Sequence, residues 1–261
     1  MLRRFLPPAI AAGVMLASFA LAQAPEGQTG YLTPDTTPST LRIMPPPPPP
    51  ASGRGADDRS IFEVTRALKG TPRWDLATRD ADLRPGPTLF ACALGVELDS
   101  ANAPVLSRLF DRVAIDARGV IDPPKDHYDR PRPYLSRPDA ATCIDKTDAL
   151  TKSASYPSGH ATLSWAWGLI LAELAPDRAT EIMMRARAIG ESRIVCGVHY
   201  LSDVEEGRTN GSVLVAALHA SPDFRADLEK AREEVRSDRE TPHVGPEGCL
   251  DADQAAANPP Y

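Results

Sequence analysis

Apolar residues recur at the three- and four-residue spacing of amphipathic helices over most of the chain after residue 58. The first such segment opens with the capping box Ser60-x-x-Glu63, which is typical of a helix N-terminus. Others cover residues 87–97, 103–114, 158–175, 177–195, 204–218 and 224–235. No run of alternating β-branched residues competes with this pattern, and the chain has no internal repeat. The pattern therefore predicts an all-α domain over residues 59–238, followed by a C-terminal tail of residues 239–261.

Residues 1–24 have a different pattern, in which a basic start, Arg3-Arg4, precedes one apolar run. The run is short for a membrane-spanning helix, and Ala20-Leu21-Ala22 has the small-x-small form of a signal-peptidase site. We therefore expect a signal peptide of residues 1–22, with cleavage after Ala24 as a second option and a membrane anchor as the alternative. The mature protein is expected to be periplasmic or secreted, without stable membrane association.

Proline separates the next segment from the helical domain. The chain has 27 prolines, and the segment of residues 23–58 contains six in a row, Pro45 to Pro50. Polyproline lacks backbone donors and packs poorly into a core, so we expect a surface strap or linker. A docking site for a proline-binding partner is the alternative interpretation.

Charge and length narrow the function classes. A chain of 261 residues with a formal charge of −6 has room for one large core, and its acidity disfavours a nucleic-acid partner. Loss of Arg3 and Arg4 on cleavage would make the mature charge −8. A small anionic substrate stays open, because a few local cations can outweigh the net charge. Apolar helices in excess of one core would be consistent with a homodimer.

The four cysteines are widely spaced and form no Cys-x-x-Cys pair, which disfavours a zinc site. In an oxidising compartment two disulfides are expected. The sequence allows three pairings, of which we favour Cys92–Cys143 with Cys196–Cys249.

The first of three polar clusters is Pro157-Ser158-Gly159-His160, at the start of the helix predicted over residues 158–175. The first turn of a helix offers unpaired amides and the positive end of its dipole, so it attracts an anion. His160 would lie beside such an anion, able to give or take a proton. The alternative is an ordinary serine cap followed by a surface histidine.

The second cluster combines Arg193 with His199 and Asp203. A spacing of four residues lets the carboxylate of Asp203 accept a hydrogen bond from one ring nitrogen of His199, which leaves the other nitrogen as a nucleophile. The guanidinium of Arg193 can bind two phosphate oxygens. The alternative is a histidine–aspartate pair on a helix surface beside a solvated arginine.

The third cluster contributes two more cations, Lys125 and Arg132, on a segment stiffened by Pro131 and Pro133. Alone it could be a basic surface loop. Together the three clusters offer three cations, a helix N-terminus and two histidines, a set that suits a tetrahedral oxyanion. No grouping with metal-ligand spacing is evident, so we expect no metal and no other cofactor.

These clusters form an ordered pattern, Lys-x6-Arg-Pro, Pro-Ser-Gly-His and Ser-Arg-x5-His-x3-Asp. The pattern resembles the three-part motif shared by type 2 phosphatidic acid phosphatases, vanadium haloperoxidases and bacterial acid phosphatases. The sequence around these motifs, including Lys-Asp-His-Tyr and Ser-Arg-Ile-Val-Cys-Gly-Val-His, is similar to that of class A bacterial non-specific acid phosphatases. The resemblance covers roughly residues 31–235 and implies a compact helical bundle.

The resemblance also implies a metal-independent hydrolysis of small phosphate monoesters, with broad specificity, through a phosphohistidine. His199 would be the nucleophile, Asp203 its orienting carboxylate and His160 the general acid and base. The phosphate-binding residues would be Lys125, Arg132, Ser158, Gly159 and Arg193. A vanadate-dependent haloperoxidase and a non-catalytic phosphate-binding protein are the alternatives. The motifs leave the physiological substrate and a phosphotransferase side activity open.

Overall fold

The computed structural model describes residues 28–241, 246, 248–257 and 259–261, so the predicted signal peptide lies outside the described residues. The longer helices are α1 (Gly53–Thr65), α2 (Pro72–Arg79), α4 (Pro104–Tyr128), α7 (Gly159–Leu174), α8 (Ala179–Val195), α9 (Leu201–Leu218), α10 (Pro222–Glu240) and α11 (Cys249–Ala257). Shorter turns are α3 (Ala91–Leu94), α5 (Pro133–Ser136) and α6 (Asp148–Lys152), with 3-10 turns at Thr40–Arg42, Arg66–Leu68, Gly86–Phe90 and Pro176–Arg178. No strand occurs in this described part of the chain, which confirms the all-α prediction.

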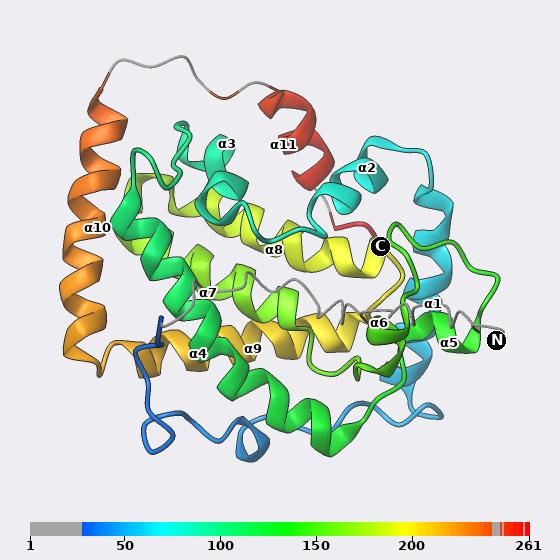
Figure 1. Ribbon diagram of the computed structural model, residues 1–261. Coiled ribbons are helices and arrows are strands. Elements are labelled where there is room, and N and C mark those ends of the chain that lie inside the picture. Colours follow the sequence, from blue (N-terminus) through cyan, green and yellow to red (C-terminus); the bar gives the residue numbers. More distant parts are fainter. Residues whose placement is uncertain (1–27, 242–245, 247, 258) are drawn as a thin grey trace, which may run out of the picture.

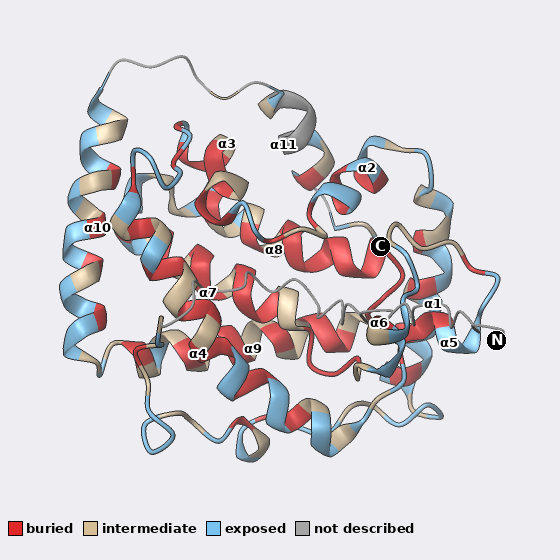
Figure 2. Cartoon of the chain, viewed as in Figure 1, coloured by how far each residue is buried: buried red, intermediate tan, exposed pale blue. Residues whose placement is uncertain are grey.

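Helix α7 is the central element, packed between α8 and α9 and crossed by α4 (Figure 1). Its sequence is apolar on nearly every face, as expected for a helix surrounded by others. Trp167 stacks on Phe110 of α4 with ring centroids 4.7 Å apart. Figure 2 shows buried residues along α7 and on the inner sides of α8 and α9, whereas α10 exposes its outer face. The core therefore lies between α4, α7, α8 and α9.

Two glycines set the spacing of α7 and α9. A Cβ on Gly207 would lie 2.7 Å from the carbonyl oxygen of Ser158, and one on Gly211 would lie 2.6 Å from that of Thr162. Larger residues would push the two helices apart. This close approach lets the amide of Ser158 donate to the carbonyl oxygen of Asp203 at 2.8 Å.

Several boundaries differ from the sequence expectation. Helix α1 begins at Gly53, capped by the Ser52 hydroxyl, so the predicted capping box lies inside the helix. The region of residues 87–97 forms a 3-10 turn and the four-residue α3 rather than one helix, because Gly95 ends it with a positive φ of 78°. No described helix is both long enough and apolar enough to cross a membrane.

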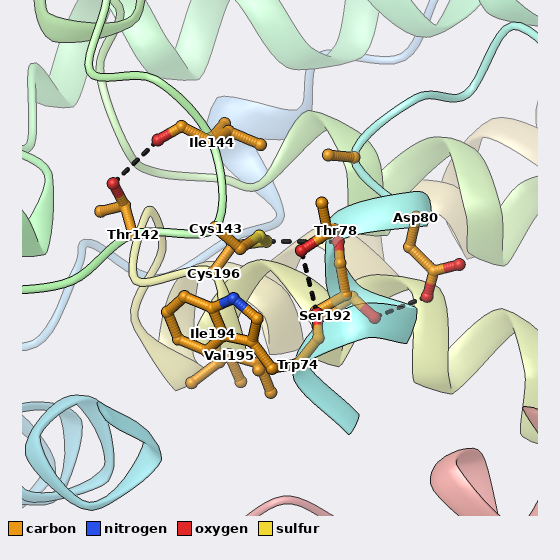
Figure 3. Close-up of a disulfide and its surroundings, with 12 residues drawn as sticks. Trp74, Thr78, Asp80, Thr142, Cys143, Ile144, Ser192, Ile194, Val195 and Cys196 are labelled. Carbon is orange, nitrogen blue, oxygen red and sulfur yellow. Dashed lines mark hydrogen bonds between the residues drawn. A yellow bond between two sulfur atoms is a disulfide. The ribbon is translucent and has the colours of Figure 1, made fainter. Parts of the chain in front are cut away.

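The predicted disulfide pairing is wrong. The bonds join Cys92 to Cys249 and Cys143 to Cys196. The favoured pairing joined cysteines that follow one another along the chain, but the fold carries α11 back to α2, α3 and α8. Figure 3 shows Cys143 and Cys196 beside Trp74 of α2, at the C-terminal end of α8. This disulfide therefore anchors the loop before α6 to the segment that carries Arg193 and His199.

Candidate active site

Six of the predicted site residues meet at one cavity of ≈ 220 Å³. They come from five different places: the last turn of α4, the start of α5, the first turn of α7, the last turn of α8 and the turn between α8 and α9. The six are Lys125, Arg132, Gly159, His160, Arg193 and His199. Segments up to 74 residues apart in sequence therefore converge on a space of the size of a small ligand.

Arg193 is the most unusual group in the cavity wall. Its side chain is 3% exposed, and its Nε and Nη1 atoms have no hydrogen-bond partner among the described residues. Burial, together with the nearby charge of Arg132, lowers its pKa to about 9. A buried guanidinium without a partner is costly, and an anion in the cavity would supply the missing acceptors.

Arg132 and Lys125 are held by backbone carbonyls rather than by carboxylates. Arg132 donates through Nε to the oxygens of Leu150 and Ser153, each at 2.9 Å, and through Nη1 to Val198 at 2.9 Å. Lys125 donates to the carbonyl oxygen of Ala154. Burial lowers the pKa of Arg132 to about 10.

Burial and the repulsion of Arg132 lower the pKa of Lys125 to about 7. Neither Lys125, Arg132 nor Arg193 forms an ion pair within the described part of the chain. The three cations and Arg118 outnumber Asp122, the one carboxylate among the described residues that line the cavity, so the cavity wall carries a net positive charge.

The ring of His199 is oriented by contacts on both nitrogens. Nε2 lies 3.2 Å from Nη1 of Arg132, which can only donate, so Nε2 is the unprotonated nitrogen and Nδ1 carries the hydrogen. Nδ1 lies 3.3 Å from Ser155 Oγ and 3.4 Å from Asp203 Oδ2. Burial and the charge of Arg132 hold the pKa of His199 well below its usual range, so the ring is neutral. The lone pair of Nε2 therefore faces the guanidinium of Arg132, and both residues line the cavity.

Asp203 stays ionised although it is fully buried. Burial favours the protonated acid, but the hydrogen bond from His199 and the charge of Arg130 outweigh it and hold its pKa well below the usual range. Its Oδ2 also accepts from Ser155 Oγ at 2.5 Å and from the amide of Tyr200 at 2.8 Å. The predicted spacing of four residues brings the pair together, although His199 precedes α9 rather than lying in it.

His160 is held by the segment that follows α2. Its Nε2 lies 3.0 Å from the carbonyl oxygen of Ala81, which accepts only, so Nε2 carries the hydrogen of the neutral ring. Burial and the charge of Arg193 hold the pKa of His160 well below its usual range. Nδ1 is therefore the nitrogen available for proton exchange.

Ser158 lies behind the cavity rather than in its wall. Its hydroxyl oxygen accepts from the amide of Ala161 at 3.3 Å and caps α7. The next residue, Gly159, reaches the cavity and brings the N-terminus of α7 with it. The N-terminus of α7 therefore reaches the cavity through Gly159.

Other residues near the site were missed by sequence reasoning. Arg118 and Asp122 line the cavity two turns and one turn before Lys125 on α4, where the helical spacing could have revealed them. Arg130 and Ser155 contact Asp203, and the Arg-Pro-Arg sequence was the one available signal for Arg130. No group of three or more His, Cys, Asp or Glu side chains in the described residues could hold a metal ion.

Comparison with known proteins gives a consistent family. Residues 112–227 match the PAP2 superfamily. The chain is 43% identical to an acid phosphatase of Zymomonas mobilis over 204 residues, which are 77% of each chain. It is 34% identical to a non-specific acid phosphatase of Providencia stuartii over 234 residues, 85% of this chain and 94% of that one. It is 32% identical to a non-specific acid phosphatase of Salmonella typhimurium over 181 residues, 68% and 72% of the two chains.

Proposed function

This chain belongs to the PAP2 superfamily, and from that premise we propose that it is a secreted acid phosphatase that hydrolyses phosphate monoesters without a metal ion. The observation that carries the proposal is the cavity itself. It brings together Lys125, Arg132, Nε2 of His199 and Arg193, whose Nε and Nη1 atoms have no partner among the described residues. This is the arrangement that a phosphoryl group needs, because catalysis of its transfer depends on positioning and charge.

The proposed reaction has two steps. The negative charge of the bound substrate raises the pKa of His160, and Nδ1 of its ring takes up a proton. Nε2 of His199 attacks phosphorus, the bond from phosphorus to the ester oxygen breaks, and the leaving oxygen takes that proton from Nδ1 of His160. His160 then removes a proton from water, which attacks phosphorus and breaks the phosphorus–nitrogen bond. Inorganic phosphate leaves, and His199 returns to its neutral form.

Each remaining residue has a charge or positioning role in this proposal. Lys125, Arg132 and Arg193 bind the phosphate oxygens and stabilise the negative charge of the transition state. Ser158 and Gly159 present the N-terminus of α7 to the same oxygens. Asp203 keeps the hydrogen of His199 on Nδ1 and stabilises the positive charge that the ring gains.

Export is the second part of the proposal. Two disulfides in the described structure suit an oxidising compartment such as the periplasm. N-terminal sequencing of the secreted protein should begin at Gln23, or at Pro25 if cleavage follows Ala24. The acidic mature chain is expected to bind no nucleic acid, and sedimentation would test the homodimer.

The decisive experiment measures aryl-phosphate hydrolysis at acidic pH, with a chelator present, for the parent, for His199→Ala and for His219→Ala. We expect vanadate-sensitive activity in the parent, a loss of about 10³-fold or more in His199→Ala, and parental activity in His219→Ala. His219 is a partly exposed histidine paired with Glu173, outside the cavity, so it is a matched control.

Four outcomes would contradict the proposal in different ways. Full activity in His199→Ala would exclude it as the nucleophile, and loss of activity with chelator alone would exclude the metal-free reaction. Phosphate binding without turnover would indicate a binding protein, and halide oxidation by the vanadate-loaded protein would indicate a haloperoxidase.

A further inference from the structure

A buried charge chain runs behind His199, away from the cavity. Arg130, in the loop between α4 and α5, donates through Nη1 to Asp203 Oδ1 at 2.5 Å and through Nη2 to Asp58 Oδ2 at 2.8 Å. Asp58 lies on α1 and is 2% exposed, although it is 144 residues from Ser202 and 72 from Arg130 in sequence. None of the proposed catalytic steps uses Arg130 or Asp58.

Asp58 is fixed by the start of the helix that carries Asp203. Its Oδ1 accepts from the amide of Ser202 at 2.9 Å, and its Oδ2 accepts from the Ser202 hydroxyl at 2.6 Å. An acidic group at a helix N-terminus satisfies a free amide and interacts favourably with the helix dipole. Asp58 therefore fixes Arg130 and the first turn of α9 at the same time.

The plane of Arg130 is held as well. Its guanidinium carbon lies 4.3 Å from the ring centroid of Tyr200, and Nη1 also donates to Ser202 Oγ at 2.8 Å. The carbonyl oxygen of Arg130 accepts from the amide of Ser155, whose hydroxyl donates to Asp203. Arg130 and Ser155, the two side chains besides His199 that donate to Asp203, are thus hydrogen-bonded to each other through the backbone.

The charges of this chain alternate. Two carboxylates and one guanidinium leave a net charge of −1 next to His199. Without Asp58, Arg130 and Asp203 would form a neutral pair, and His199 would lose most of the negative field that stabilises its charged form. Asp203 is also closer to Arg130 than to His199, 2.5 Å against 3.4 Å, so Arg130 has the stronger hold on its position.

We propose that Asp58 and Arg130 are positioning residues of the reaction: they fix the carboxylate of Asp203 and set the charge that it presents to His199. This inference rests on the proposed function and deepens it. It assigns a role in the active site to α1, the helix that follows the proline-rich strap.

Several charged groups face His199, and all enter the expected pH dependence. They are Asp203 on α9, Arg132 before α5, Lys125 on α4, His160 on α7 and Arg193 on α8, with Arg130 and Asp58 behind Asp203. Removing the negative charge of Asp58 lowers the pKa of His199, and removing the positive charge of Arg130 raises it. A variant that merely loosens the fold would not shift the titration in opposite directions.

The test compares Asp58→Asn, Arg130→Met, Arg130→Lys and the double variant Asp58→Asn/Arg130→Met with the parent. We expect kcat to fall about 10- to 100-fold in the first two, while the Kd for inorganic phosphate changes less than threefold, because the cavity cations are untouched. The acidic limb of the kcat/KM profile should move to lower pH in Asp58→Asn and to higher pH in Arg130→Met. It should return towards the parental position in the double variant.

Asp227→Asn is the matched control. It breaks an Arg–Asp pair of similar geometry, Arg112 to Asp227 at 3.1 Å, that does not line the cavity. We expect a lower Tm with parental kcat and pH profile. Arg130→Lys keeps the charge and should retain more activity than Arg130→Met, which separates positioning from folding if the methionine variant is unstable.

Kinetics of folded variants that match the parent would overturn the inference, and so would limbs that shift in the same direction. Titration of the His199 ring by NMR gives the same comparison without turnover. A parent that hydrolyses no phosphate monoester would overturn the proposed function, and the ring titration would still decide whether Asp58 and Arg130 act on His199.

Discussion

Arg193 shows how a single residue can be unfavourable for stability and favourable for binding. Its guanidinium is buried, and two of its nitrogens have no acceptor in the described chain. Hydrogen bonds to a charged group contribute about 1.5–3 kcal/mol each, and this arginine forgoes them until an anion arrives. We therefore expect the same side chain to destabilise the protein without phosphate and to stabilise it with phosphate bound.

We expect Arg193→Met to separate these two effects. The KM for a phosphate monoester should rise about 10- to 100-fold, as the loss of about 1.5–3 kcal/mol implies. Without phosphate, the Tm should stay equal or rise, because a buried unpaired charge is gone. Thermal unfolding with and without inorganic phosphate checks both points.

Arg232→Met is the control for Arg193→Met, since Arg232 lies on α10 and forms partly exposed pairs with Glu173 and Glu229. Phosphate should raise the Tm of this variant as much as that of the parent. An equal rise in Arg193→Met would contradict the role assigned to the guanidinium.

At the level of single residues, the sequence predicted which side chains lie close together where they are also close in sequence. Arg193, His199 and Asp203 lie within eleven residues, so helical geometry nearly determines their proximity. Asp58 gave no such signal, because its contacts with Ser202 exist only after α1 has packed against α9. The sequence allowed two roles for Ser158, a helix cap or an anion ligand. In the structure its hydroxyl oxygen caps α7.

Among the elements, the C-terminal end of α8 is held by several contacts with other segments. Arg66 donates to the carbonyl oxygens of Ile194 and Val195 and to that of Ala141. The Cys143–Cys196 disulfide joins the same two segments, next to Trp74 (Figure 3). The turn that carries His199 is therefore fixed by a covalent bond and by a partly buried arginine.

We expect the two disulfides to differ in their effect on activity. Cys143→Ser/Cys196→Ser and Cys92→Ser/Cys249→Ser should each lower the free energy of unfolding by about 2–4 kcal/mol, because both bonds close long loops. The first pair should also lower kcat, since it frees the turn between Arg193 and His199. The second pair lies outside the cavity and serves as the matched control. Urea unfolding and steady-state kinetics test this, and equal loss of kcat in both would contradict it.

Long periodic segments could be predicted, whereas short or irregular elements could not. The expected helix of residues 158–175 corresponds to α7. An apolar segment of this length is stable as a helix that is buried among other helices. Helix α11 lies in the region taken for a tail, where a nine-residue segment has too few apolar positions for a period to emerge. It is held in place by Cys92–Cys249 and by Arg187, contacts that depend on the finished fold.

At the scale of the whole molecule, residues 28–58 of the proline-rich strap are part of the folded structure. The amides of Tyr31 and Leu32 donate to Asp116 of α4, and the hydroxyl of Tyr156 donates to Pro45 at 2.6 Å. Tyr31 also packs edge-on against Phe224 of α10. The strap therefore links α4 and α10 with the segment that precedes the active-site helix α7.

We expect a chain that begins at Pro45 to lose about 3–5 kcal/mol of unfolding free energy relative to one that begins at Gln23. It lacks the buried ring of Tyr31 and the hydrogen bonds to Asp116, and losses of this size are typical for large buried side chains. Its Kd for inorganic phosphate should stay parental, because residues 28–44 do not line the cavity. Urea unfolding and calorimetry measure both, with Tyr31→Phe as a milder control.

Unchanged stability in the shortened chain would show that the strap contributes no net stabilisation. Weaker phosphate binding at unchanged stability would instead indicate that the strap shapes the cavity. The prediction requires a large loss of stability together with parental binding.

The cluster of buried cations also has a consequence for turnover. Inorganic phosphate, the product of the proposed reaction, carries the same oxygens that the proposal has Lys125, Arg132 and Arg193 bind in the substrate. A site that binds this anion tightly releases it slowly. Product release therefore limits kcat when the chemical steps are faster than release. Below pH of about 6 a phosphate group keeps a second proton and one charge fewer, which weakens this hold. An acidic working range then reflects the exit of the product as much as the chemistry of the two histidines.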